Sequence, residues 1–170
     1  PYMDGGVGAF IQVMFAQFDS LIRLALWEHL SVQEKTKTHK RIASNLKNLK
    51  KWAKFAPANS LHKIALVEAE LARVQADHGR AREMYDEAAR LAHTSQFMQD
   101  EALAYELAGK FHLDRAMDEL AEHYLHLARR AYRNWGAVTK VQQLEEKYPG
   151  YLPKPQALSA RGQKTSGGSQ

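Results

Sequence analysis

The fold is decided by residues 100–149, which read DEALAYELAGKFHLDRAMDELAEHYLHLARRAYRNWGAVTKVQQLEEKYP. Alanines and large apolar residues recur along this stretch at steps of three and four, which is the period of an α-helix. The pattern predicts a helix over Asp100–Leu113, a second over Met117–Asn134 and a third that starts at Trp135. Small side chains opposite large ones let two helices approach closely. The stretch is therefore predicted to serve the packing of helices against each other and not catalysis.

Four more helices are predicted upstream, over Ala9–His29, from Ser31 to about Ala56, over Leu61–His78 and over Ala81–Ala92. Ser31 and Glu34 match the capping box, in which two side chains satisfy free amides at a helix start. Further signals are predicted to mark helix ends: a stop at Pro57, a cap at Asn59 or Ser60, a left-handed end at Gly79 and a stop at Pro149.

An internal repeat supports this map, because residues 60–68 echo residues 20–28 at a distance of 40 positions. The same shift relates Ala81, Tyr85 and Ala88 to Ala121, Leu125 and Ala128. We therefore predict an all-α fold of stacked helical hairpins, a TPR-like right-handed superhelix of about seven helices. The expected organisation is an irregular segment over 1–8, the helical-repeat domain over 9–149 and a flexible linker or tail over 150–170, where Pro, Gly, Ser and Lys dominate.

Composition narrows the function. The chain has 170 residues and no cysteine, so neither a disulfide nor a thiol nucleophile is available. Its longest apolar-rich stretch, residues 7–30, is interrupted by charged and amide side chains, so a membrane span is not expected. No signal peptide is recognisable. These features favour a cytoplasmic protein.

The formal charge of +5 is concentrated in the second predicted helix. A candidate interaction face lies along it, formed by Lys37, Lys40, Lys47, Lys51 and Lys54. Such a stripe could bind nucleic acid, anionic lipid or an acidic protein. A solvated or internal docking face is the simpler interpretation of a charge run on a helix. Nucleic acid is disfavoured because neither a glycine-hinged recognition helix nor aromatic interleaving accompanies the stripe.

Neither metal binding nor catalysis is predicted. His123 and His126 lie one turn apart with Glu119 nearby, but a metal site needs three or four ligands. His39 and His62 raise a phosphorelay role, but His39-Lys40-Arg41-Ile42 lacks the acidic residue and the proline of a phosphoaccepting His box, and a His beside charged residues is usually solvated. No nucleophile has a base beside it, and no phosphate loop is present. We therefore expect no catalytic residue, no cofactor and no metal.

Residues spread from Phe15 to Pro149 carry a family resemblance. In order, they are Trp52-Ala53, Pro57, Asn59, His62-Lys63, Glu68-Ala69-Glu70, Tyr85-Asp86, Glu101-Ala102-Leu103-Ala104, Glu106, Phe111, Ala131-Tyr132, Trp135-Gly136-Ala137, Lys140-Val141, Leu144 and Tyr148-Pro149. The string resembles the helical, tetratricopeptide-like region of very large multidomain signalling proteins. In these a serine/threonine-kinase-like domain and an AAA/STAND-type ATPase precede the helices, and a GAF domain and a sensor histidine kinase follow.

The resemblance implies a non-enzymatic scaffold or coupling segment of a two-component signalling protein whose ATP-binding and kinase domains lie outside this chain. Its partners would be flanking domains of the same polypeptide or a regulatory protein. The matched residues that we expect to be structural are Trp52, Pro57, His62, Glu70, Tyr85, Glu106, Trp135, Gly136 and Lys140. Trp135 would plug a hairpin and Gly136 would allow close helix approach. Ala116 and His112 depart from the pattern, where Gly and an aromatic residue are usual. A free-standing peptide-binding module is the alternative.

Overall fold

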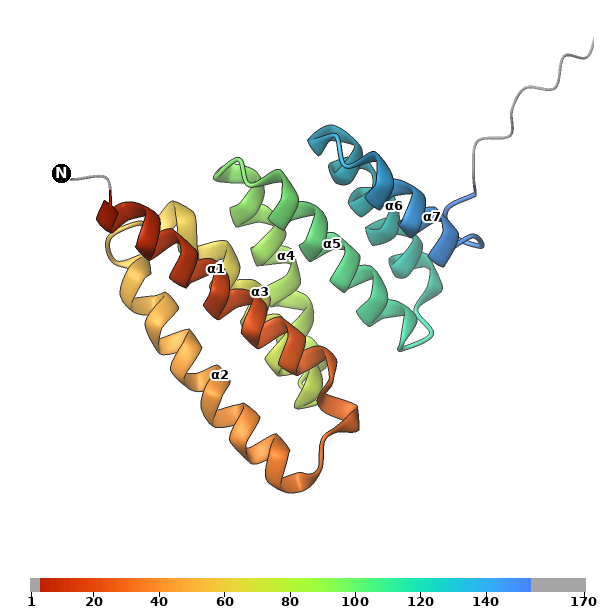
Figure 1. The fold of residues 1–170 in the computed structure, drawn as a ribbon. Coiled ribbons are helices and arrows are strands. Elements are labelled where there is room, and N and C mark those ends of the chain that lie inside the picture. The colour runs from red at the N-terminus through yellow and green to blue at the C-terminus, as the bar shows by residue number, and fades with distance from the viewer. Residues whose placement is uncertain (1–3, 154–170) are drawn as a thin grey trace, which may run out of the picture.

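The computed structural model describes residues 4–153, and every regular element in that range is helical. The elements are α1 (Asp4–Ala25), the 3-10 helix η1 (Trp27–His29), α2 (Val32–Ala53), α3 (Pro57–Val74), α4 (His78–Thr94), α5 (Met98–Leu113), α6 (Asp118–Trp135) and α7 (Val138–Lys147). The prediction of an all-α fold with about seven helices is confirmed for the described residues. Successive helices pack side by side, with α1 and α2 at one end of the stack and α7 at the other (Figure 1).

The helix starts follow local signals to different degrees. The capping box is confirmed, because the Ser31 hydroxyl accepts from the Glu34 amide while the Glu34 carboxylate accepts from the Ser31 amide. The predicted cap at Asn59 or Ser60 is wrong, since α3 already begins at Pro57. Proline suits the first helical position because its missing N–H has no partner there anyway. The predicted irregular segment 1–8 is also too long, since α1 begins at Asp4.

Four helices end in the same kind of backbone turn, which we call a joint. Ala76, Gln96, Ala116 and Gly136 adopt left-handed backbone with φ of 59°, 62°, 54° and 82°. The amide after each donates to the carbonyl five positions earlier at 2.9 to 3.0 Å, which is the Schellman motif. The joints recur every 20 residues, so the 40-residue repeat consists of two helix-plus-joint units. Gly79, predicted to end the third helix, lies instead inside α4.

The core between α3 and α6 is built from small residues facing large ones. Ala81, Ala88, Ala121 and Ala128 are all at most 1% exposed, so the neighbouring helix lies directly on their methyl groups. Gly109 is packed so closely that a Cβ there would lie 2.9 Å from Leu125 Cδ2. The predicted packing role of this stretch agrees with this burial, although Leu120 is 37% exposed.

The helical domain extends beyond the predicted boundary at residue 149. Leu152 is fully buried against α6 and α7, and its amide donates to the Tyr148 carbonyl at 2.8 Å. The Tyr151 hydroxyl donates to Asp118 Oδ1 at 2.7 Å, which joins the segment to the start of α6. The rest of the predicted tail, residues 154–170, lies outside the described residues.

Candidate interaction surface

A buried carboxylate joins three alternating helices. Asp100, in the first turn of α5, accepts from Gln17 Nε2 of α1 at 3.3 Å and contacts His62 Nε2 of α3 at 2.9 Å. Lys63 Nζ donates to the same Oδ2 atom. The Asp100 and Lys63 side chains are 6% and 3% exposed. The Phe97 ring covers the cluster, with its centroid 4.6 Å from the His62 ring and 5.1 Å from Lys63 Nζ.

The cluster keeps Asp100 ionised. Burial by itself raises the pKa of this carboxyl, but the hydrogen bond from His62 and the charge of Lys63 together lower it to about 2. A buried ammonium and a buried carboxylate are each costly in isolation and acceptable as a hydrogen-bonded pair. The arrangement is consequently a structural tether between α1, α3 and α5.

A second buried carboxylate, Glu70 of α3, holds α4 and the α1 end together. The Tyr85 hydroxyl of α4 donates to Glu70 Oε1, and Arg73 donates to Glu70 Oε2 at 2.7 Å. Arg73 also donates to the Leu24 carbonyl at the end of α1, at 3.0 Å. Burial, followed by the Glu70 charge, raises the pKa of Tyr85, so the phenol stays protonated and remains a donor.

Glu106 repeats this arrangement farther along the stack. The Tyr132 hydroxyl of α6 donates to Glu106 Oε2 at 2.7 Å, and Lys140 of α7 donates to Glu106 Oε1 at 3.3 Å. Burial and the Glu106 charge raise the pKa of Tyr132. Of the nine residues expected to be structural, five therefore take part in interhelical polar contacts: His62, Glu70, Tyr85, Glu106 and Lys140.

The other four of these nine residues lie outside the polar contacts. Pro57 opens α3, and Trp52 is half-buried on the last turn of α2. Trp135 does not plug a hairpin, because its side chain is 49% exposed at the last residue of α6. The close-approach role expected of Gly136 is also wrong: nothing lies within 4 Å of a Cβ placed there, and glycine suits the position because φ is 82°.

The basic face lies on the exposed side of α2. Lys37, Lys40, Lys47, Lys51 and Lys54 are all exposed, and the opposite side of the helix buries Ile42, Leu46 and Leu49. Glu68 of α3 pairs with Lys50 at 2.7 Å, whereas Lys40, Lys47, Lys51 and Lys54 form no ion pair with any residue between 4 and 153. These four ammonium groups are available to an acidic partner.

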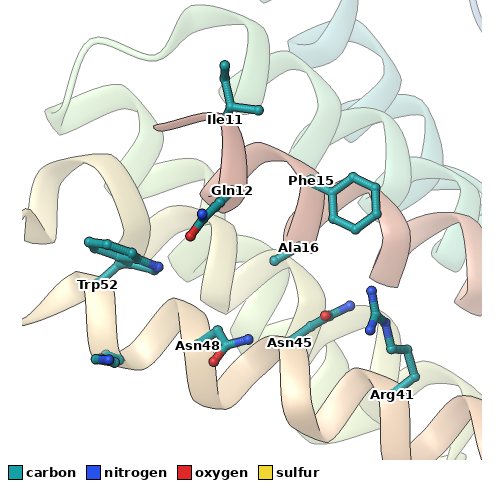
Figure 2. Close-up of a pocket in the computed structure, with 9 residues that line it drawn as sticks. Ile11, Gln12, Phe15, Ala16, Arg41, Asn45, Asn48 and Trp52 are labelled. Carbon is teal, nitrogen blue, oxygen red and sulfur yellow. The ribbon is translucent and has the colours of Figure 1, made fainter. Parts of the chain in front are cut away.

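A groove of about 420 Å³ runs between α1 and α2 beside this face. Figure 2 shows that Ile11, Gln12, Phe15 and Ala16 line it from α1, and that Arg41, Asn45, Asn48 and Trp52 line it from α2. Lys51 completes the lining.

The groove is held open by fixed polar contacts at one end. Asp19 Oδ2 accepts from Arg41 Nε at 2.9 Å and from Asn45 Nδ2 at 2.8 Å. Burial raises the pKa of Asp19, but the hydrogen bonds from Arg41, Asn45 and Arg23 outweigh it and lower the pKa to about 2. The two helices are therefore pinned at a set separation, and a preformed groove loses little entropy on binding.

The remaining candidate groups lie apart. His39 and His123 are exposed, and His126 lies 3.8 Å from Glu122 on its own helix. Between residues 4 and 153 no three His, Asp or Glu side chains are grouped closely enough to hold a metal ion. Among the helices of the same range, none has the length and apolar character needed to cross a membrane.

Sequence reasoning missed Asp100, Gln17, Phe97 and Gly109, which all act through contacts between helices. Asp100 lies 38 positions from His62, and no local pattern links them. One signal was available for Asp100: it occupies the place of Ser20 and Ser60 in the 40-residue repeat, and all three side chains are buried.

Comparison with known proteins gives one partial match. Over 62 residues, 36% of this chain, the sequence is 36% identical to a hybrid signal transduction histidine kinase G of Dictyostelium discoideum. The matched segment is 2% of that protein's length. No family model matches the chain, and no solved structure matches it at a significant level.

Proposed function

We propose that this chain is a non-catalytic helical-repeat segment of a cytoplasmic multidomain signalling protein, and that it mediates contacts with flanking domains or a regulatory protein. In this proposal the stack is a TPR-like right-handed superhelix, and the catalytic and ATP-binding domains belong to other parts of the polypeptide. The partial similarity to a hybrid histidine kinase supports the signalling context. The family resemblance of the matched string supports the coupling role.

The observation that carries the proposal is the α1–α2 end of the stack. Apolar side chains, a groove of about 420 Å³ and four lysines without ion pairs in the described range meet on one surface there. Exposed apolar surface bordered by polar groups marks sites of protein contact. The interhelical carboxylate clusters at Asp100 and Glu70 give this surface a rigid support.

A pull-down tests the proposal. The chain is immobilised and the neighbouring domains of its parent polypeptide are supplied separately in solution. We expect at least one to be retained. Retention of none of them at micromolar concentration would contradict the coupling role. ATP hydrolysis by the chain alone would contradict the non-catalytic one.

A second candidate is a free-standing peptide-binding module, because another groove of about 470 Å³ lies among α1, α3 and α5. Glu28, Arg73, Leu107 and Phe111 are among its lining residues, so it offers both charged and apolar contacts. Such a groove suits an extended or helical peptide. Nuclear magnetic resonance titration with a peptide library would favour this function if shifts were confined to that groove.

A further inference from the structure

The outer side of α1 carries an apolar stripe that continues one residue past its end at Ala25. Five side chains form it: Ile11 (59% exposed), Phe15 (61%), Phe18 (42%), Ile22 (59%) and Leu26 (51%). At 3.6 residues per turn their steps of four, three, four and four place them within an arc of roughly 80°. Val13 and Leu24 lie on the opposite side of the helix, Leu21 lies on the flank between, and all three are buried in the core. The stripe is thus a second apolar face of the same helix.

The internal repeat shows how two positions of this face, Ile22 and Leu26, are covered when a neighbour is present. Ile22 and Leu26 correspond to His62 and Leu66 of α3, 40 positions later. His62 and Leu66 are 2% and 1% exposed, because α3 lies between other helices of the stack. The same repeat positions are therefore covered by helix in an inner unit and exposed at α1. The geometry that covers them in α3 favours an α-helical occupant on α1.

The charges beside the stripe indicate the chemistry of that occupant. The groove between α1 and α2 brings Ile11 and Phe15 of the stripe to the same opening as Lys51 and Trp52. Lys47 and Lys54 lie with Lys51 along a second, shallow depression on α2. A helix packed on the stripe would have one edge facing these ammonium groups, so acidic residues on that edge would complement them.

We propose that the α1 stripe and the lysine edge of α2 dock an amphipathic α-helix from a partner domain, with apolar residues on one face and Glu or Asp along one edge. The docking is of the helix-in-groove kind, with contacts spaced at three and four residues. This inference rests on the proposed function and specifies the partner: its contact element is a helix, and its edge is acidic.

The test uses two synthetic 18-residue helical peptides with the same leucine face, one with Glu and one with Lys along the edge. Binding is followed by amide chemical shifts of the full chain. We expect shifts in α1 and α2 and at least tenfold tighter binding of the Glu peptide. The F15S/I22S variant should bind the Glu peptide at least tenfold more weakly than the unaltered chain does. The K47E/K51E variant should instead prefer the Lys peptide.

The matched control is V32S/V138S, because Val32 and Val138 are 82% and 66% exposed outside the stripe, and this variant should bind as the unaltered chain does. Circular dichroism checks that every variant folds. Equal affinity for both peptides, or shifts only outside α1 and α2, would overturn the inference. Self-association abolished by F15S/I22S would assign the stripe to a second copy instead, and tighter binding to phosphatidylserine vesicles than to the Glu peptide would assign it to a membrane.

The pull-down described above separates the two proposals. A flanking domain that still binds the F15S/I22S variant would leave the coupling role intact and refute this docking site. Tight binding of the Glu peptide, with no flanking domain retained, would keep the docking site and refute the coupling role.

Discussion

Replacing Asp100 with Asn should destabilise the chain strongly. The substitution keeps the shape of the side chain but removes the negative charge next to Lys63, whose side chain is 3% exposed. Among the described residues, the only other group in contact with this ammonium is the Phe97 ring, whose centroid lies 5.1 Å away. Breaking one side of a buried ion pair costs about 3–5 kcal/mol, because the remaining charge stays buried without compensation. That is a large share of the roughly 5–15 kcal/mol that stabilises a typical domain.

Urea unfolding followed by circular dichroism measures this cost. The D100N/K63M double variant should recover most of it, because the uncompensated ammonium is then gone. D114N is the matched control: Asp114 pairs with Lys110 at 2.6 Å, but both side chains are about half exposed, so its loss should cost less than about 1 kcal/mol. If D100N cost no more than D114N, or if K63M gave no recovery, the tether would not have the role described.

Acidification should remove the contribution of the same Asp100 contact to the stability of the chain. The folded pKa of Asp100, about 2, lies below its ordinary value of 3.8, so its contribution is present above pH 4 and disappears as the pH falls towards 2. This lowering of the pKa of Asp100 corresponds to about 2 kcal/mol in the free energy of unfolding. The D100N variant should therefore lose less stability than the unaltered chain between pH 4 and pH 2. An identical loss would contradict the assigned pKa.

Two backbone predictions follow from the glycine and left-handed positions. A116G should stabilise the chain by about 1 kcal/mol in urea unfolding, because Ala116 has a left-handed φ of 54°. The control A43G, at an exposed position inside α2, should destabilise the chain by about the same amount. Effects of the same sign in both variants would contradict the left-handed joint at Ala116. G109A should lower the free energy of unfolding by about 1–3 kcal/mol, because the added Cβ would lie 2.9 Å from Leu125. G79A, with open space around the added Cβ, should raise it by about 0.5 kcal/mol. Equal effects would refute the close approach at Gly109.

Local patterns predicted the helices well and their ends less well. The helical period gave seven helices, and Ser31 with Glu34 placed the start of α2, because both signals depend on neighbouring residues. Three of the four left-handed joints contain no glycine, so no residue type marked them. Gly79 was chosen instead, three positions after the true joint at Ala76. Hydrogen bonds hold these joints, and backbone amides are common to every sequence.

Contacts between distant helices could not be predicted. His62 was assigned to the matched string without a partner, and its contact with Asp100 depends on how α3 and α5 pack. Periodicity also cannot show whether an apolar face has a neighbour. Phe18, Leu21, Leu24 and Leu26 all recur at helical spacing in one segment, but the structure buries Leu21 and Leu24 and leaves Phe18 and Leu26 exposed.

Amide hydrogen exchange of the chain, alone and within the proposed parent polypeptide, tests most directly whether the α1–α2 end contacts a partner. We expect the amides of α1 and α2 to exchange more slowly in the proposed parent polypeptide, where a partner helix would cover their outer surface, while those of α4 and α6 change little. Identical exchange of α1 and α2 in both contexts would show that this end of the stack contacts nothing, and would contradict the account.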